Sequence, residues 1–581
     1  MEANSREYQR QAIDAEIKTL ELSIRALKHR RNTFAPISCL PTEVITSIFF
    51  ILRLSVQPLR AGGKRDHLAW LRVTHVCHQW REIALNNPLF WSHIDFTGIS
   101  LAGAAEMLVR AKKAPLHLGV WTTGHQQDDV RFSAFKRELH SRVSYISHLH
   151  IRADSVLFCR TLEQLVSPAP ILKSLSLSTK ANYLITSSPP TIPDTLFGGT
   201  TPQLSCLELH KCNISWKSPL LKGLTHLEIH SPSEHARPSL VDWLNTLDEI
   251  WQLKKLILHS ASPIAPPFPL DVERTVTLSF LTYLDISASV GDCALALSHL
   301  ILPALAQLCI KAYSFLPDGG DVLKLLPYVT RHSHGPQDTQ PLQNVAIRGG
   351  REEVEIYAWP DIHGEAPNFH PFYLVTDLSA PRVALYVMCT HWILDTHVEL
   401  LSAAMTALPQ GNLMKLTTEL CEARLDKVFW CNHAPRWPLL ECVRLAPISV
   451  RGFAEMILED NGGHENPLLP SLTNLSLPWS TLTTPRTLRL CNALMKHVEQ
   501  GVPVEELDLL NCAATSYAVQ LLSEIVASIL SPGDLYDDSD SYYETDDTYL
   551  RYCSDSDDEG DEGEMDSGGE EEEDYLVMDE D

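Results

Sequence analysis

Residues 201–230 read TPQLSCLELHKCNISWKSPLLKGLTHLEIH, and this stretch contains the pattern that decides the fold. An apolar residue is followed by two others, a second apolar residue, one other and a third apolar residue, as in Leu204, Leu207 and Leu209. The same pattern begins again at Leu224. The closing pair, two apolar residues separated by one other, predicts a short strand whose alternate side chains are buried on one face of a sheet.

The pattern recurs from about residue 116 to residue 512, mostly at start-to-start spacings of 20 to 32 residues. Such periods are typical of leucine-rich repeats, in which a strand-loop-helix unit cannot bury its own apolar face and is stabilised by stacking on its neighbours. We therefore predict an irregular leucine-rich-repeat horseshoe of the α/β class, a parallel sheet backed by helices. The repeats start at Ile146, Leu172, Leu204, Leu224, Leu253, Leu281, Leu305, Leu342, Leu440, Leu472 and Val504.

Segments between these strands have apolar residues at helical spacing, which predicts the backing helices. They are residues 240–250, 294–301, 453–458 and 490–498. The pattern fails between Arg348 and Val428, where prolines interrupt it, so we expect degenerate repeats or long loops there. Aromatic and imidazole side chains also fall beside or between the strands. For these we expect packing between repeats, with contact to a bound partner as the alternative: Trp216, Trp243, Trp251, His210, His230 and His259.

A compact helical segment precedes the repeats. Pro41 opens a run of apolar residues at helical spacing, and its ring pre-sets the backbone of a first helical turn. The polar stretch 53–67 contains Pro58 and two glycines, which predicts a loop. Helical spacing resumes over residues 68–84, and Pro88 prevents the helix from continuing.

These residues together resemble the F-box domain. The run from Leu71 to Trp91 looks especially like the F-box-like proteins abundant in mushroom-forming fungi, in which a short helix precedes the box and leucine-rich sequence follows it. His78 stands where that family more often has Arg or Lys. The resemblance is carried by Leu40-Pro41-x-Glu43 with Ile45, Ile48 and Phe49, by Val76-Cys77-x-x-Trp80, and by Pro88-Leu89-x-Trp91.

The resemblance implies an adaptor-binding domain. In the family the helices present an apolar surface to a Skp-type adaptor, which connects to a cullin and thence to a ubiquitin-charged enzyme. The alternative is that the same side chains form the core of a small helical domain that caps the first repeat. The residues that the resemblance assigns to adaptor binding are Leu40, Pro41, Ile45, Ile48, Phe49, Val76 and Trp80.

The N-terminal segment predicts one amphipathic helix. Its apolar residues recur at alternating spacings of four and three residues, which is the pattern of a coiled-coil seam, until Arg31 ends it after about two heptads. We expect this helix to pack on the next domain, with self-association as the alternative. The seam consists of Ile13, Ile17, Leu20, Ile24 and Leu27.

The charge of the chain is concentrated in its last residues. The formal net charge is −26, but residues 534–581 hold 23 Asp and Glu against one basic residue, Arg551. The first 533 residues therefore carry 50 acidic and 46 basic groups, so no basic surface argues for nucleic acid. The tail has few aliphatic residues and self-repelling charge, which predicts disorder. A solubilising role is expected, and docking to a basic partner is the alternative.

Acidic residues three positions downstream mark four serines of the tail as candidate phosphorylation sites. They are Ser541, Ser554, Ser556 and Ser567.

Other classes of function lack their sequence signals. No stretch is apolar and long enough for a membrane span, and the N-terminus has no apolar stretch of the signal-peptide type. The fourteen cysteines are scattered, which is typical of reduced thiols in a cytoplasmic or nuclear protein. The pairs Cys389/His391 and Cys431/His433 lack the ligand spacing of a structural zinc site, so we expect buried cysteines and neither metal nor cofactor.

We therefore expect a non-enzymatic substrate-receptor subunit of a cullin-type (SCF) ubiquitin ligase, whose repeats bind a target protein. A leucine-rich scaffold without ligase association is the alternative, and an enzyme hidden in the irregular region a third class. The expected domains are an N-terminal amphipathic or coiled-coil helix (1–35), an F-box-like domain (36–96), the repeats (97–530) and a disordered acidic tail (531–581).

Overall fold

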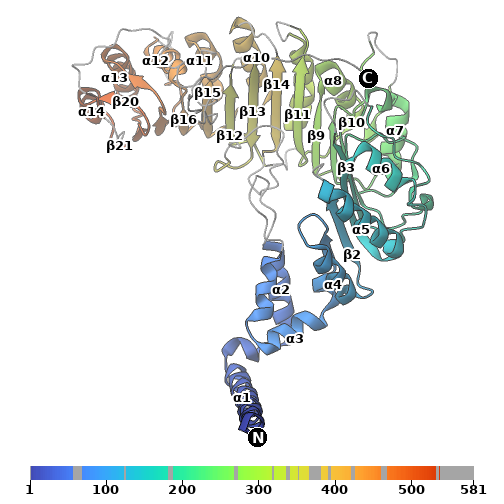
Figure 1. Cartoon of the computed structure of the whole chain (residues 1–581). Coiled ribbons are helices and arrows are strands. Elements are labelled where there is room, and N and C mark those ends of the chain that lie inside the picture. Colours follow the sequence, from blue (N-terminus) through green and yellow to red (C-terminus); the bar gives the residue numbers. More distant parts are fainter. Residues whose placement is uncertain are drawn as a thin grey trace, which may run out of the picture. The chain divides into compact units, whose positions relative to one another are not determined.

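Figure 1 shows the computed structural model of the chain. By contact density the chain divides into two compact units, Met1–Ala346 with Glu352–Lys415, and Ile347–Arg351 with Leu416–Asp581. The four candidate phosphorylation sites lie outside the described residues, as does nearly all of the acidic tail. The structure describes residues 2–55, 68–122, 126–180, 188–266, 273–316, 320–334, 340–350, 352–364, 381–389, 394–420, 425–459, 467–530 and 535–536.

The first unit begins with helices. The predicted continuous helix over residues 68–84 is wrong, because the chain forms a 3-10 helix, breaks, and starts a new α-helix. Cys77 adopts an extended backbone at the break (φ −156°, ψ 170°). The elements are α1 (Glu2–Thr33), η1 (Pro36–Cys39), α2 (Thr42–Ser55), η2 (Ala69–His75), α3 (His78–Asn86) and η3 (Pro88–Trp91).

Aromatic side chains form the core of this helical domain. Phe49 on α2 contacts the rings of Trp80 and Phe90 at centroid distances of 5.1 and 5.7 Å. The Trp91 indole donates a buried hydrogen bond of 2.9 Å to the carbonyl of Ala84, which ties η3 to α3. Arg53 donates to the carbonyl of Phe90 at 2.6 Å, and burial lowers the pKa of its guanidinium to about 10. These contacts hold the separate helices together as one domain.

A mainly parallel sheet follows. In spatial order its strands are β1, β2, β3, β4, β5, β6, β7, β9, β11, β14 and β13. Their bounds are β1 (His93–Asp95), β2 (Leu116–Trp121), β3 (Ile146–Asp154), β4 (Ser174–Lys180), β5 (Cys206–His210), β6 (His226–His230), β7 (Lys255–His259), β9 (Tyr283–Ser289), β11 (Gln307–Ser314), β13 (Glu353–Trp359) and β14 (Val383–Cys389). A separate short pair is formed by β8 (Val276–Thr277) and β10 (Leu300–Ile301).

Two columns of aliphatic side chains run across this sheet and confirm the repeat pattern. Strand register places the two pattern residues of each strand beside their equivalents in the next strand. All of these side chains are at most 1% exposed, so the stacked strands share one continuous core. One column is Leu175, Leu207, Leu227, Leu256, Leu284 and Leu308, and the other is Leu177, Leu209, Ile229, Leu258, Ile286 and Ile310.

Three neighbouring repeats turn at a non-glycine residue in the left-handed region. Lys211, Ser231 and Ser260 directly follow β5, β6 and β7 with φ of 54°, 50° and 53°. The amide of Lys211 donates to the carbonyl of His230, and the amide of Ser231 donates to that of His259. Hydrogen bonding between strands thus continues one residue beyond each strand, which stabilises an otherwise unfavourable backbone conformation.

The repeat that starts at Leu305 departs from the prediction. Leu305 is 71% exposed, and its neighbour Ala306 is buried in its place. The amide of Ala306 donates to the carbonyl of Pro303, so the turn before β11 is one residue closer to the strand than in the repeats before it. Only the first position of the pattern therefore differs from the prediction, because Leu308 and Ile310 are buried in β11 as predicted.

Two further strands lie in the irregular region. β14 pairs in parallel with β11, and β13 runs antiparallel to β14. Between the repeats of β11 and β12 (Asn344–Gly349), the sheet thus contains a hairpin that comes later in the chain. The irregularity predicted for residues 348–428 reflects this inserted pair.

Helices lie along the sheet of the first unit (Figure 1), as the helical spacing between the strands predicts. They begin with α4 (Leu101–Ala111), α5 (Gln126–Arg142) and α6 (Ser155–Leu162), and continue with α7 (Leu240–Glu249), α8 (Val290–Ser298), α9 (Leu326–Ser333) and α10 (Leu394–Ala407). Short 3-10 turns are η4 (Val143–Tyr145), η5 (Leu196–Gly199), η6 (Pro219–Leu221), η7 (Glu234–Ala236) and η8 (Gly320–Leu325). The division between the units passes through β12 and β15 (Lys415–Leu420).

The second unit repeats the strand-helix alternation. Its parallel strands pair in the order β16, β17, β19 and β21, and β18, β20 and β22 form a small parallel sheet. Among the residues described here, no helix is both long and apolar enough to cross a membrane. The strands are β16 (Cys442–Arg444), β17 (Asn474–Ser476), β18 (Thr481–Leu482), β19 (Glu506–Asp508), β20 (Ala513–Thr515), β21 (Ser528–Leu530) and β22 (Leu535–Tyr536). The helices are α11 (Lys427–His433), η9 (Ala434–Arg436), η10 (Pro447–Ser449), α12 (Val450–Leu458), α13 (Thr484–Glu499) and α14 (Ser516–Ser523).

Candidate functional site

The helical domain exposes several of the apolar residues that the sequence assigns to adaptor binding. Leu40 and Pro41, just before α2, are exposed, and so is Val76 at the break between η2 and α3. Ile37 and Val44 are exposed as well. We call these five residues, Ile37, Leu40, Pro41, Val44 and Val76, the open apolar set.

The other residues of the predicted adaptor surface lie deeper. Ile48 and Trp80 are half-buried, whereas Ile45 and Phe49 are each 1% exposed. Side chains that have already lost their water within the domain have little surface left for a partner. The structure therefore places Ile45 and Phe49 in the core of the domain, which corrects the expectation that they contact the adaptor.

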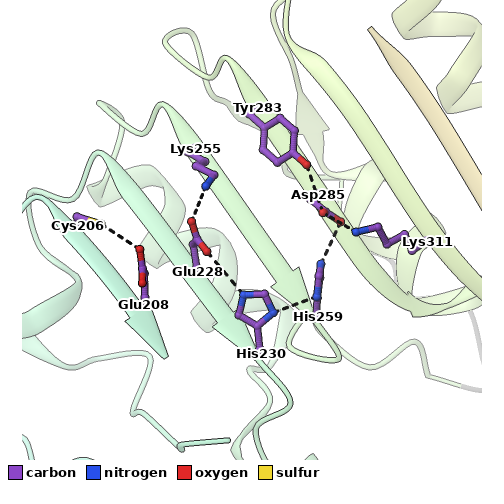
Figure 2. A network of polar contacts seen from close by, with 9 residues as sticks. All are labelled: Cys206, Glu208, Glu228, His230, Lys255, His259, Tyr283, Asp285 and Lys311. Carbon is purple, nitrogen blue, oxygen red and sulfur yellow. Dashed lines mark hydrogen bonds and ion pairs between the residues drawn. The ribbon is translucent and has the colours of Figure 1, made fainter. Parts of the chain in front are cut away.

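A second candidate site lies on the sheet. Residues between the two buried pattern positions point to the opposite face, because side chains alternate along a strand. Register brings Glu208, Glu228 and Asp285 onto one row of that face, with Ile257 between the last two. His210, His230 and His259 form the adjacent row. Figure 2 shows that most of these side chains join in one polar network.

Glu228 anchors one end of the network. Its carboxylate accepts a hydrogen bond of 2.6 Å from the ammonium of Lys255 and lies 3.7 Å from the His230 ring. Burial opposes its charge, but the nearby His230 ring and the hydrogen bond and charge of Lys255 outweigh burial and lower its pKa to about 2. Glu208, one strand away, has a raised pKa because of burial and the neighbouring charge of Glu228.

Asp285 is the centre of the other end. Its carboxylate accepts from Lys311 at 2.9 Å, from His259 at 3.1 Å and from the Tyr283 hydroxyl at 3.4 Å. It is 1% exposed. Burial alone would raise the pKa of this carboxyl, but the hydrogen bond from His259 and the charge of Lys311 together lower it. The site therefore holds a buried carboxylate with hydrogen-bond donors on its own strand and on the two neighbouring strands.

The two halves of the network are joined by a pair of imidazoles. Nδ1 of His230 lies 3.0 Å from Nδ1 of His259, so one of these nitrogens must carry a proton. Burial lowers the pKa of His259, which keeps its ring neutral. Because Nε2 of His259 donates to Asp285, its Nδ1 accepts, and His230 is the donor. The hydrogen bonds from His230 to His259 and from His259 to Asp285 thus run in one direction, toward the buried carboxylate.

Three further imidazoles stack across the first strands. The rings of His93, His117 and His148 follow one another at centroid distances of 3.6 and 3.7 Å. Burial, together with the charge of His148, lowers the pKa of His117 to about 3. Burial and the neighbouring charge of His230 lower that of His210, in the other row, to about 4. The rings of His117 and His210 therefore stay neutral in the folded protein at mildly acidic pH.

Acidification is expected to destabilise the first unit through these histidines. An imidazole whose pKa falls on folding binds more protons in the unfolded chain, so stability is full above about pH 6.5 and falls as the pH drops toward the folded value. His117 and His210 should each contribute a loss of about 1 kcal/mol per pH unit after allowance for solvent screening. Denaturant unfolding of the full chain at pH 7 and pH 5 measures this loss.

The variant His117→Gln should lose less stability than the wild type between these two pH values. His140→Gln, at an exposed histidine on α5, is the matched control and should follow the wild type. If His117→Gln lost as much stability as the wild type, the stacked histidines would not be the source of the pH dependence.

The aromatic and imidazole residues predicted to pack between repeats differ in their burial. Trp216 and Trp243 are buried, as expected for packing, whereas Trp251 is 54% exposed and contacts the ring of Phe280. The three histidines are brought together on the sheet. Sequence reasoning missed Glu208, Glu228, Asp285, Lys255 and Lys311, although Leu-Glu-Leu-His and Leu-Glu-Ile-His in consecutive repeats were a usable signal.

The cysteine and histidine pairs lie as follows. Cys389 is buried, and Cys431 is partly exposed and contacts Glu459 at 3.2 Å. His433 is buried between the rings of Phe429 and Trp437, while His391 lies outside the described residues. Within the described part of the chain, no group of three or more His, Cys, Asp or Glu is arranged to hold a metal ion.

Comparison with known proteins identifies the helical domain. A family model described as F-box-like matches residues 37–97. A search of curated proteins finds no match to the chain. The match covers η1 to η3 and β1, which is the segment that contains the open apolar set. The chain therefore carries an F-box-like domain, followed by a long, mainly parallel sheet consistent with repeats.

Proposed function

We propose that this chain is a substrate-receptor subunit of a cullin-type (SCF) ubiquitin ligase. Its F-box-like domain binds a Skp-type adaptor, the adaptor connects it to a cullin, and the repeats bind a target protein. The chain transfers no ubiquitin itself, and we place it in the cytoplasm or the nucleus. The coarser conclusion, a protein that works through protein–protein interaction, follows from the F-box-like domain alone.

The observation that carries the proposal is the open apolar set. Four of its members lie between Ile37 and Val44. All five side chains are exposed to solvent, although the domain has an aromatic core. Binding hot spots are a few large apolar groups that lose water completely at an interface. The match of this same segment to F-box-like domains supports a Skp-type adaptor as the partner.

One observation favours the alternative of a repeat scaffold. The Arg110 guanidinium on α4 lies over the Trp91 ring at 4.4 Å, and Arg53 donates to the carbonyl of His93 at 3.4 Å. The helical domain is thus attached to the first repeat, as a capping element would be. A cap, however, needs no exposed apolar residues. A measurement of adaptor binding therefore distinguishes the ligase receptor from the repeat scaffold.

Co-expression of the full chain with a Skp-type adaptor is expected to give a complex that co-purifies, and Val76→Asp is expected to abolish it. A charge placed within an apolar interface is desolvated without a partner, which weakens binding by about a hundredfold or more. Val156→Asp is the matched control, because Val156 on α6 has the same exposed fraction as Val76, 59%.

The fold of each variant is checked by its unfolding midpoint. A wild-type chain that ignores the adaptor would contradict the proposal and favour the scaffold. Retention of the complex by Val76→Asp would contradict the assignment of the surface.

We propose that the acidic tail is a site of regulation and that the sheet face with the polar network is the site of target binding. Ser541, Ser554, Ser556 and Ser567 remain candidates for phosphorylation, which would add negative charge to an already anionic segment. The partly exposed side chains of this sheet face are the candidate contacts for the target, because repeat proteins bind through the variable positions beside their strands; they are Glu208, His210, His230 and His259.

A further inference from the structure

We propose that α1 forms an antiparallel two-helix coiled coil with α1 of a second copy of this chain. The expectation that α1 packs on the next domain is wrong for its seam. Ile13, Ile17, Leu20, Ile24 and Leu27 are each between 49% and 66% exposed, so nothing in the described part of the chain covers them. The C-terminal end of α1 meets the domain, where His29 contacts the ring of His78 edge-on at 5.6 Å.

The seam has the composition of a two-stranded coiled coil. With Ile17 and Ile24 at a positions, Leu20 and Leu27 fall at d positions, and this combination of β-branched a and leucine d residues favours two helices over three or four. The exposed apolar area of this seam is buried when it packs against an identical seam. A second copy of the chain provides that seam.

Charge complementarity determines the direction of the second helix. The residues that flank the seam are acidic in the first half, Asp14 and Glu16, and basic in the second half, Lys28 and Arg30. An antiparallel arrangement with Leu20 opposite Ile24 of the second copy places Asp14 against its Lys28 and Glu16 against its Arg30. Two-fold symmetry makes each of these attractive contacts twice.

The alternatives fit less well. In the in-register parallel arrangement, Glu16 of each copy faces Glu21 of the other and Ser23 faces Lys28, so the flanking residues contribute two repulsions and no attraction. The antiparallel arrangement has one like-charge contact, between the two Glu21 side chains, against four attractive ones. The flanking charges therefore favour the antiparallel pair.

Charge reversal tests both the partner and the direction. The full chain should self-associate in sedimentation experiments, with a mass that rises with concentration from 65.1 kDa toward twice that value. Asp14→Lys with Glu16→Lys should weaken the dimer at least about tenfold, and so should Lys28→Glu with Arg30→Glu. An equimolar mixture of the two variants should associate as tightly as the wild type, because each now complements the other.

The control variant is Lys18→Glu, whose b position faces away from the seam. It changes the net charge as much as Lys28→Glu alone does and should keep the wild-type association, whereas Lys28→Glu should weaken it. A chain that stays monomeric at every soluble concentration would overturn the proposal. Tighter association of Glu16→Lys would show a parallel pair and would also overturn it, as would association that none of these variants alters.

Discussion

Asp285→Ala is expected to lower the free energy of unfolding of the first unit by about 3–5 kcal/mol. The substitution leaves the Lys311 ammonium, whose side chain is only 11% exposed, without the carboxylate that neutralises it. It also removes the acceptor of the His259 imidazole. Removing one partner of a buried ion pair is more damaging than removing both, because the remaining charge is desolvated and unpaired.

Denaturant unfolding of the full chain measures this effect. Asp248→Ala is the matched control: Asp248 pairs with Arg274 at 2.8 Å, but both side chains are exposed, so its loss should lie within about 1 kcal/mol. Adding Lys311→Met to Asp285→Ala should restore part of the stability. Equal effects of Asp285→Ala and Asp248→Ala would contradict the assignment of Asp285 as the centre of a buried network.

Phe49→Ala is expected to destabilise the helical domain by about 3–5 kcal/mol and to abolish adaptor binding as a consequence. Phe49 is 1% exposed and contacts Trp80 and Phe90, so its removal leaves a cavity among aromatic rings. Hydrogen exchange of the segments that form α2, η2 and α3 should accelerate, because the domain unfolds locally.

The control for Phe49→Ala is Phe34→Ala. Phe34 is 77% exposed, so its removal should leave exchange in the domain unchanged. A Phe49→Ala variant that kept slow exchange but lost the adaptor would contradict a core role and would return Phe49 to the binding surface. The contrast with Val76→Asp, which should lose the adaptor with the domain intact, separates core from surface.

The repeats were predictable because their signal is local. Two aliphatic residues separated by one other predict a strand whatever the rest of the chain does, and each of the eleven predicted repeat starts is followed by a strand. The hairpin of β13 and β14 was not predictable in the same way. Its place next to β11 depends on pairing between segments 75 residues apart along the chain, such as Leu308 with Val383, and no local pattern records that pairing.

The polar network was missed for a related reason. Glu228 and Lys255 meet because β6 and β7 pair in one register, and a shift of one residue would place them on opposite faces. Once strand starts are known to a single residue, the row of Glu208, Glu228 and Asp285 follows. At the Leu305 repeat, too, the strand positions Leu308 and Ile310 lie as predicted, although Ala306 is buried in place of Leu305.

The F-box-like segment was recognisable, but its buried and exposed residues were not separable. The second helix is apolar almost all round from Val44 to Leu52, so helical periodicity does not show which side faces inward. The side of this helix that faces inward is the one that contacts the rings of Trp80 on α3 and Phe90 on η3, which follow it in the chain. Val76 is exposed because the chain breaks at Cys77, in a stretch whose spacing predicted an unbroken helix.

The central claim is that the open apolar set binds a Skp-type adaptor. Hydrogen exchange of the full chain with and without purified adaptor tests it most directly. We predict slower exchange in the amides around Ile37 to Val44 and around Val76, with no change in β5 to β9. Slower exchange confined to the repeats, or no change anywhere in residues 37–97, would contradict the claim.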